Sequence, residues 1–195
     1  MVGGSGGYGW WEGRQSRASA GAGPEELICS WAIFPFVVSA TVEKRVDEAG
    51  ETEYVEAAWT LKEYIRSAEG VLKQRRGFFI DAYRRSKTHL FFEDDSLAAF
   101  ASVRSDGYIL FLAVRPEARG LGYGRRLITE IADDHRTVTC HARTTNEAAL
   151  GFYDYLGFRV CRRIDNYYED NGDAYYLKLG EDSSIREKVS EFFGR

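Results

Sequence analysis

The chain has 195 residues, of which 44% are hydrophobic and 14% aromatic, enough to fill one hydrophobic core. This composition excludes a disordered chain and a miniprotein held together by disulfides. With 26 Lys and Arg against 30 Asp and Glu, the formal net charge is −4, so the chain lacks the basic excess typical of nucleic-acid-binding proteins.

The cysteines argue against a structural metal site. Cys29, Cys140 and Cys161 are widely separated, with no CxxC pair and no Cys/His spacing of the zinc-binding kind. Asp133, Asp134 and His135 resemble a metal cluster, but no second ligand group follows at a suitable spacing. We therefore expect no metal, and a reducing, cytoplasmic environment.

The first forty residues differ from the rest of the chain. Residues 1–23 hold eight of the 20 glycines and show no helical or strand period, which is typical of a flexible tail. Residues 27–38 form an apolar run of twelve, shorter than the roughly 18 residues that a transmembrane helix requires. Glu25 and Glu26 directly before this run disfavour a secretory signal. We expect residues 1–40 to lie outside the domain, and a native start downstream of Met1 stays open.

From residue 41 the pattern indicates a compact α/β domain that extends to residue 180. Residues 41–46 alternate between apolar and charged, as in a half-buried strand. An apolar stripe that ends near Gly70 predicts a long helix. The members of the stripe are Tyr54, Ala58, Leu61, Ile65 and Ala68. A second helix is predicted from Leu72 to about Tyr83.

Strand patterns dominate the middle of the chain and then alternate with helical ones. Three β-rich runs, separated by turns that include Asp106-Gly107, predict an antiparallel meander over residues 88–114. Helical patterns follow over residues 121–135 and 146–156. Strand patterns follow over residues 137–142, 158–164 and 174–179. Residues 181–195 predict a final amphipathic helix that docks on the domain or on a partner.

A glycine-rich turn, Arg119 to Gly124, lies between a predicted strand and the helix after it. Such a turn can direct backbone N–H groups at an anion, and glycines let a phosphate approach the backbone closely. No Gly-Lys-Ser/Thr follows, so the turn is not a Walker loop. Taken alone, it is equally consistent with a purely structural turn.

A second motif decides between these readings. The pattern N-x-x-A-x-x-x-Y-x-x-x-G-F runs from Asn146 to Phe158, about twenty residues after the R-x-x-G-x-G turn. Together the two motifs resemble the GCN5-related N-acetyltransferases (GNAT) over residues 41–180. The resemblance implies the GNAT fold, a mixed, mostly antiparallel twisted sheet of about seven strands flanked by about four helices. It also implies an acyltransferase with acetyl-CoA as cosubstrate and no metal.

The resemblance also assigns cofactor-binding residues along the fourth strand and the following turn. A bulge at residues 112–114 would present a backbone N–H to the thioester oxygen, and Val114 would bond the pantetheine arm. Asn146 would orient the cofactor through its side chain. The complete set is Leu112, Ala113, Val114, Arg119, Gly120, Leu121, Gly122, Tyr123, Gly124, Arg125, Asn146 and Tyr153.

Acetyl transfer to an amine needs a base, because a free α-amine has a pKa near 8 and a lysine amine one near 10.4. His141 is the candidate, since imidazole titrates near 6.5, and strand alternation places it on the face opposite Cys140. The resemblance implies a Tyr partner for this His, which Tyr108 matches, and an acid for the leaving thiolate, which Tyr153 matches. The alternative is that His141 only hydrogen-bonds within the sheet and that both tyrosines only pack.

A closer resemblance, to protein N-terminal acetyltransferases including the ribosomal-protein alanine type, rests on residues 141–146 and 162–168. It implies that Tyr167, Tyr168 and Tyr108 hold a substrate peptide, and the acidic loop after them, residues 169–173, would attract a positively charged N-terminus. Three functions stay open: acetylation of protein or peptide N-termini, acetylation of lysine or small amines, and non-catalytic acetyl-CoA binding. We expect a monomer or homodimer, a possible ribosome association, no specific nucleic acid and no membrane.

Overall fold

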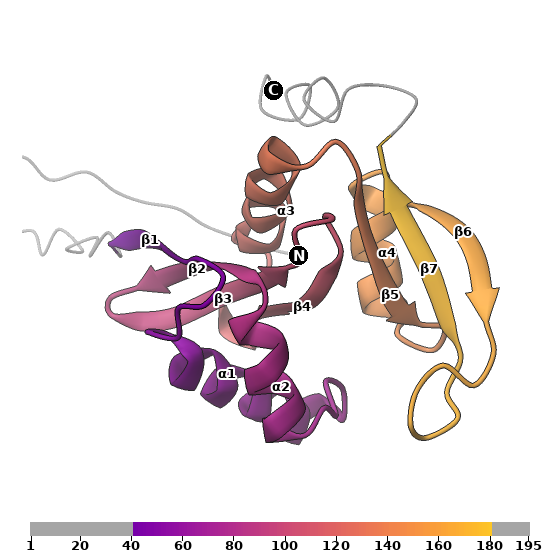
Figure 1. The fold of residues 1–195 in the computed structure, drawn as a ribbon, viewed down its shortest axis with the longest axis horizontal. Helices are drawn as coiled ribbons and strands as arrows, with labels where there is room; N and C mark the ends of the chain where they lie inside the picture. Colours follow the sequence, from indigo (N-terminus) through magenta and orange to yellow (C-terminus); the bar gives the residue numbers. More distant parts are fainter. Residues whose placement is uncertain (1–40, 181–195) are drawn as a thin grey trace, which may run out of the picture. The chain divides into compact units, whose positions relative to one another are not determined.

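The computed structural model describes residues 41–180, so the expected N-terminal tail, apolar run and C-terminal helix lie outside the described residues. No helix among residues 41–180 is both long enough and apolar enough to cross a membrane. The elements are β1 (Val42–Asp47), α1 (Val55–Glu69), α2 (Arg76–Arg84), β2 (Lys87–Glu93), β3 (Ser96–Val103), β4 (Ile109–Val114), a 3₁₀ turn (Pro116–Ala118), α3 (Tyr123–Asp134), β5 (Val138–Arg143), α4 (Glu147–Tyr155), β6 (Arg159–Ile164) and β7 (Ala174–Leu179) (Figure 1).

The strands form two antiparallel sheets. One has the order β1-β2-β3-β4 and the other β5-β7-β6. Within the described part of the chain, an isolated parallel bridge between Tyr108 and Thr139 is the only strand pairing between the two sheets. Beyond this bridge β4 and β5 part, as Figure 1 shows. The expected seven strands and four helices are confirmed, although the strands are divided between two sheets.

Helices cover both faces of the first sheet, because alternate residues of its strands point in opposite directions. Leu90 and Phe92 of β2 pack with Phe79 in the cluster formed by α1 and α2. Phe91, between them, packs instead with Leu127 of α3. All five side chains are at most 5% exposed. Strand β4 lies between the same two hydrophobic clusters, because its Ile109 belongs to the one on the α3 side and its Phe111 to the other.

Two predicted helix starts are wrong. The second helix begins at Arg76 rather than Leu72, because Leu72 has a φ of 55°, which interrupts the helical path. The helix predicted from Leu121 begins at Tyr123, because Gly122 has a left-handed φ of 87°. The first helix, by contrast, ends as expected, with Gly70 in the left-handed conformation at its C-cap.

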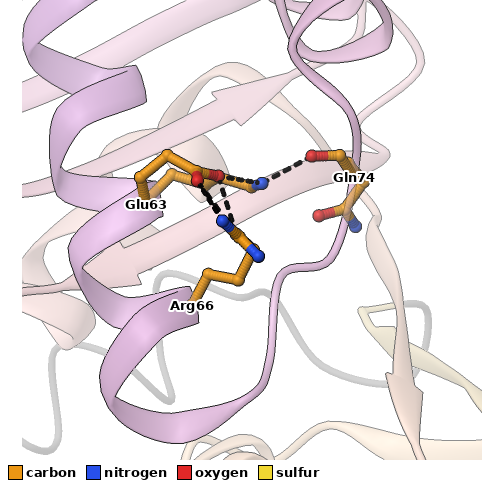
Figure 2. A network of polar contacts seen from close by, with 4 residues as sticks. Glu63, Arg66 and Gln74 are labelled. Atoms are coloured by element: carbon orange, nitrogen blue, oxygen red, sulfur yellow. Dashed lines mark hydrogen bonds and ion pairs between the residues drawn. The ribbon is translucent and has the colours of Figure 1, made fainter.

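A buried lysine ties α1 to the segment that leads into α2. The Lys62 side chain is fully buried, and its Nζ donates hydrogen bonds to Gln74 O (2.5 Å) and Glu63 Oε1 (2.8 Å). Arg66 also pairs with Glu63, at 2.6 Å, and Figure 2 shows this network between the side of the helix and the segment that carries Gln74. The ammonium lies 4.5 Å from the ring centre of Trp59, which is half-buried and packs against the core.

Candidate active site

Where β4 parts from β5, one backbone edge of β4 pairs with no other strand of residues 41–180. Arg115 N donates a 2.8 Å hydrogen bond to Ala98 O of β3. Since alternate residues of a strand turn their backbone groups to opposite sides, Ala113 also faces β3, whereas Leu112 and Val114 face away from it. The N–H groups of both residues and the C=O of Leu112 are thus directed into the gap between the sheets, while Val114 O accepts a 3.4 Å hydrogen bond from Arg119 Nε.

The bulge predicted at residues 112–114 is not there. Pairing of β3 with β4 is regular from Ala99 and Val114 back to Ser102 and Phe111. The register shift occurs one step earlier, at Leu110, close to the turn through Gly107. The exposed N–H of Val114 therefore results from strand alternation and from the divergence of β5, not from a bulge.

The glycine turn leads from β4 into α3. Gly120 (φ 79°) and Gly122 (φ 87°) adopt left-handed conformations that favour glycine. A Cβ atom at either position would meet nothing within 4 Å, so the space above the turn is open. Because the first N–H groups of a helix have no intrahelical acceptor, α3 presents donors to this space. The turn fits an anion such as a phosphate.

Two residues of the predicted cofactor set act through packing. The Tyr123 side chain is only 3% exposed and lies against Phe91, with ring centres 5.9 Å apart, so only its backbone can face a ligand. At Gly124 a Cβ would approach the Phe152 ring to 3.0 Å. Gly124 therefore permits α3 to approach α4 closely.

The polar residues of the set have partners of their own. Arg119 forms an ion pair with Glu69 at the end of α1 (2.6 Å), and Arg125 is half-buried in the first turn of α3. Asn146 caps α4, because its Oδ1 accepts a hydrogen bond from Ala149 N (3.1 Å). Its amide NH₂ is the group that could donate to a cofactor.

His141 of β5 is surrounded by tyrosines. Its Nδ1 is hydrogen-bonded to Tyr108 Oη at 2.7 Å and lies 3.3 Å from Tyr167 Oη. The Tyr167 ring stacks on the imidazole, with centres 4.3 Å apart and planes inclined by 17°. Tyr176 contacts the imidazole as well, at 5.1 Å between ring centres. The predicted pairing of His141 with Tyr108 is thus present in the structure, and these contacts fix the imidazole orientation.

The electrostatics of this cluster favour a neutral imidazole. Burial lowers the pKa of His141 below its usual 6.5, and the positive charge of Arg162 lowers it further. Its buried Nε2 has no hydrogen-bond partner among residues 41–180. Burial raises the pKa of Tyr108, which therefore stays protonated. With Nδ1–H donating to Tyr108, the Nε2 lone pair can accept a proton.

Tyr153 of α4 lies in the core between the sheets. Its side chain is 8% exposed, and its hydroxyl interacts with the thiol of Cys140. Burial raises the pKa of Tyr153 well above 10, so the hydroxyl keeps its proton. Burial also raises the pKa of Cys140 to about 12, which makes this thiol a poor nucleophile.

The comparison with protein families decides what this arrangement is. A model of the acetyltransferase (GNAT) family matches residues 47–158, more than half of the chain. The chain belongs to the GNAT family.

GNAT relatives include enzymes of several acceptor classes. N-alpha-acetyltransferase 30 of Saccharomyces cerevisiae is 35% identical over 83 residues, which cover 40% of this chain and 47% of that protein. N-alpha-acetyltransferase RimI of Mycobacterium tuberculosis is 39% identical over 70 residues, covering 34% and 44%. A 5-NmdU N-acetyltransferase of Pseudomonas phage PaMx11 is 34% identical over 86 residues, covering 40% and 61%. The chain thus spans about half of these curated relatives.

Solved structures confirm the GNAT fold. The ribosomal-protein-S18-alanine N-acetyltransferase of Escherichia coli superposes with a TM-score of 0.59 at 22% identity, over 72% of this chain and 97% of that one. The NatC complex bound to Gag peptide and CoA gives a TM-score of 0.59 at 20% identity, over 72% and 98%. At these identities the likeness concerns the fold.

The tyrosines predicted to hold a substrate lie beside His141. Tyr167 and Tyr168 belong to the loop between β6 and β7, where Asn166 has a φ of 53°. The two rings are 5.0 Å apart, and the Arg143 guanidinium lies 3.9 Å from the ring centre of Tyr168. Burial raises the pKa of Tyr168 to about 12. The structure therefore brings Tyr108, His141, Tyr167 and Tyr168 together on one wall.

Two carboxylates of the acidic loop at residues 169–173, those of Asp170 and Asp173, are paired with basic residues of the same chain and are not free to attract a positively charged N-terminus. Asp170 is paired with both Arg143 (2.9 Å) and Lys73 (3.0 Å), and these partners hold the pKa of its carboxyl well below the usual range. Asp173 is paired with Arg163. These carboxylates serve to fix the loop, and Lys73 ties it to the segment before α2.

Sequence reasoning missed three residues of this region: Lys73, Arg162 and Tyr176. Tyr176 lies directly opposite His141 in the register of β5 with β7. Its strand was predicted, but the register, which selects Tyr176 over Tyr175, is not encoded in the strand pattern itself. Lys73 lies in a stretch that was predicted to be part of the second helix, and the helical pattern gives no indication of its ion pair with Asp170.

Proposed function

We propose that this GNAT protein transfers the acetyl group of acetyl-CoA to the N-terminal α-amine of a protein or peptide. The observation that carries the proposal is the His141 cluster, in which a neutral imidazole is hydrogen-bonded to Tyr108 and covered by Tyr167. The relatives named N-alpha-acetyltransferase support the same acceptor.

The groups that would hold acetyl-CoA are mainly backbone donors. The glycine turn and the start of α3 would receive the phosphates, and the free edge of β4 at Leu112 and Val114 would pair with the pantetheine arm as a neighbouring strand does. The Val114 N–H would donate to the thioester oxygen as negative charge develops there. When bound, acetyl-CoA supplies the acyl group as an activated thioester.

Two side chains would move the protons. His141 would accept at Nε2 the proton that the amine loses as its nitrogen bonds to the acetyl carbon. Tyr153 would donate its hydroxyl proton to the sulfur as the carbon–sulfur bond breaks. No covalent enzyme intermediate is needed, which agrees with the buried, un-ionised state of Cys140.

A small amine is a second candidate acceptor, favoured by the relative named 5-NmdU N-acetyltransferase. The two are separated by following CoA thiol release with peptides that have a free N-terminus, blocked peptides that contain lysine, and small amines. We expect turnover of free N-termini that falls by about 10²-fold or more in His141→Ala and Tyr153→Phe. Turnover of blocked peptides or small amines alone would refute the proposal.

A further inference from the structure

Three aromatic or charged side chains form a row across the second sheet. His141 of β5 lies opposite Tyr176 of β7, and Tyr176 lies opposite Arg162 of β6. Directly opposed residues in antiparallel strands point to the same face, so all three lie on the His141 face. The ring contacts agree, since the Arg162 guanidinium is 5.3 Å from the centre of the Tyr176 ring. Two strand spacings, roughly 10 Å, separate the backbones of His141 and Arg162.

An irregularity in β6 is what places Arg162 on this face. The register pairs Val160 with Leu177 but Arg162 with Tyr176, so Cys161 is an extra residue in β6. If β6 paired regularly with β7, Cys161 would lie opposite Tyr176 and Arg162 would point to the other face. The irregularity therefore delivers a cation to the face that carries the imidazole.

The described residues hold no ion pair for Arg162, whose side chain is exposed. Four nearby aspartates have other partners. These pairs are Asp170 with Arg143 and Lys73, Asp173 and Asp165 with Arg163, and Asp106 with Arg104. Glu169 of the same loop is exposed. Arg162 is the charged residue that acts on the titration of His141.

We propose that Arg162 is a specificity-determining residue that binds a carboxylate of the acceptor close to the reacting amine, so that acidic peptide N-termini are preferred. A guanidinium held over an aromatic ring keeps its N–H groups available for a carboxylate. Bound at His141, a peptide that carries Asp or Glu near its first residue brings this carboxylate toward Arg162. This inference rests on the proposed function, because it assumes that the amine binds at His141.

The test uses peptides with Ala at position one and Glu, Gln or Lys at position two or at position three. Residue one is held constant so that the α-amine does not change. For the full-length protein we expect kcat/KM to be about fivefold higher with Glu than with Gln at one of these positions, lower again with Lys, and less selective at high salt. Arg162→Gln should remove the preference, and Arg162→Glu should reverse it.

Arg136→Gln is the matched control, because Arg136 is an exposed arginine just before β5 and its loss changes the net charge equally. It should keep the preference. Equal turnover of the Glu, Gln and Lys peptides, or a preference that persists in Arg162→Gln, would overturn the role of Arg162 and leave the proposed function intact.

Failure of the proposed function gives a different result. If only blocked peptides react, at their lysine, the role of Arg162 is tested with blocked peptides that carry Glu, Gln or Lys next to the reacting lysine. If nothing reacts, fluorescence anisotropy of C-terminally labelled peptides on wild-type and Arg162→Gln protein tests it by binding. In either case a preference for Glu that depends on Arg162 supports its role in binding a carboxylate of the acceptor, and the absence of that preference refutes this role.

Discussion

At the scale of single residues, the site depends on the protonation state of His141. Burial and the nearby Arg162 both lower its pKa, so the imidazole is neutral at pH 7 without a carboxylate to orient it. Tyrosine hydroxyls take that orienting role here. They fix the ring without adding the negative charge that would raise its pKa.

The sign of this shift predicts a pH profile. At saturating peptide, kcat should fall as the pH drops through the pKa of His141, which lies below 6.5. In Arg162→Gln the loss of a neighbouring positive charge favours the imidazolium, so the same limb should move to higher pH. The check is kcat between pH 5 and 9, roughly the range in which imidazole and α-amine titrate, together with NMR titration of the His141 imidazole. An acid limb that does not move would contradict the assignment of His141 as the base.

At the scale of elements, the segments with chemical roles are held by contacts between distant parts of the chain. The loop after β6 is fixed by Lys73 and Arg143, which come from the segment before α2 and from β5. The segment that contains Lys73 is fixed in turn by Lys62 through the carbonyl of Gln74. The buried ammonium of Lys62 therefore helps to position the loop after β6, through the segment that contains Lys73 and Gln74.

This support predicts a stability effect. Lys62→Met keeps the volume but leaves the Gln74 carbonyl without its donor, while Glu63 retains Arg66. We expect a loss of about 1–3 kcal/mol in the free energy of unfolding, measured by urea denaturation. Lys44→Met, which removes only an exposed pair with Glu130, should cost less than about 1 kcal/mol. Equal effects of the two variants would show that burial of Lys62 contributes nothing.

Elements were predictable to the extent that their signals are local. Strand and helix patterns placed His141 in a strand and Tyr153 in a helix, because each lies in a segment with a clear period. Tyr108, predicted at the start of a strand, lies just before β4, and its pairing with His141 came from the family resemblance. The position of Arg162 depended on one extra residue in β6, and the free edge of β4 depended on where two sheets part. Such features arise from pairing between segments far apart in the sequence, so a single strand pattern does not contain them.

At the scale of the whole molecule, the first sheet contains a second imidazole in a very different setting. His89 of β2 is 2% exposed on the α3 face, and neither ring nitrogen has a hydrogen-bond partner among residues 41–180. Burial lowers its pKa below 6.5, and so does the positive charge of Lys87. The charges of Glu130 and Asp134 on α3 oppose this shift, and that of Lys44 adds to it.

His89 therefore links folding to pH. Below about pH 6.5 His89 binds a proton in the unfolded chain but not in the folded protein. The free energy of unfolding should therefore fall as the pH decreases, by up to about 1.4 kcal/mol per pH unit. The fall should stop once His89 is protonated in the folded protein as well. His141, whose pKa is lowered too, adds a loss of the same sign. In His89→Leu the free energy of unfolding, measured by urea denaturation at a series of pH values, should depend less steeply on pH in this range. His135→Gln, at the end of α3, serves as the control, and a wild-type slope that persists in His89→Leu would assign acid sensitivity to other groups.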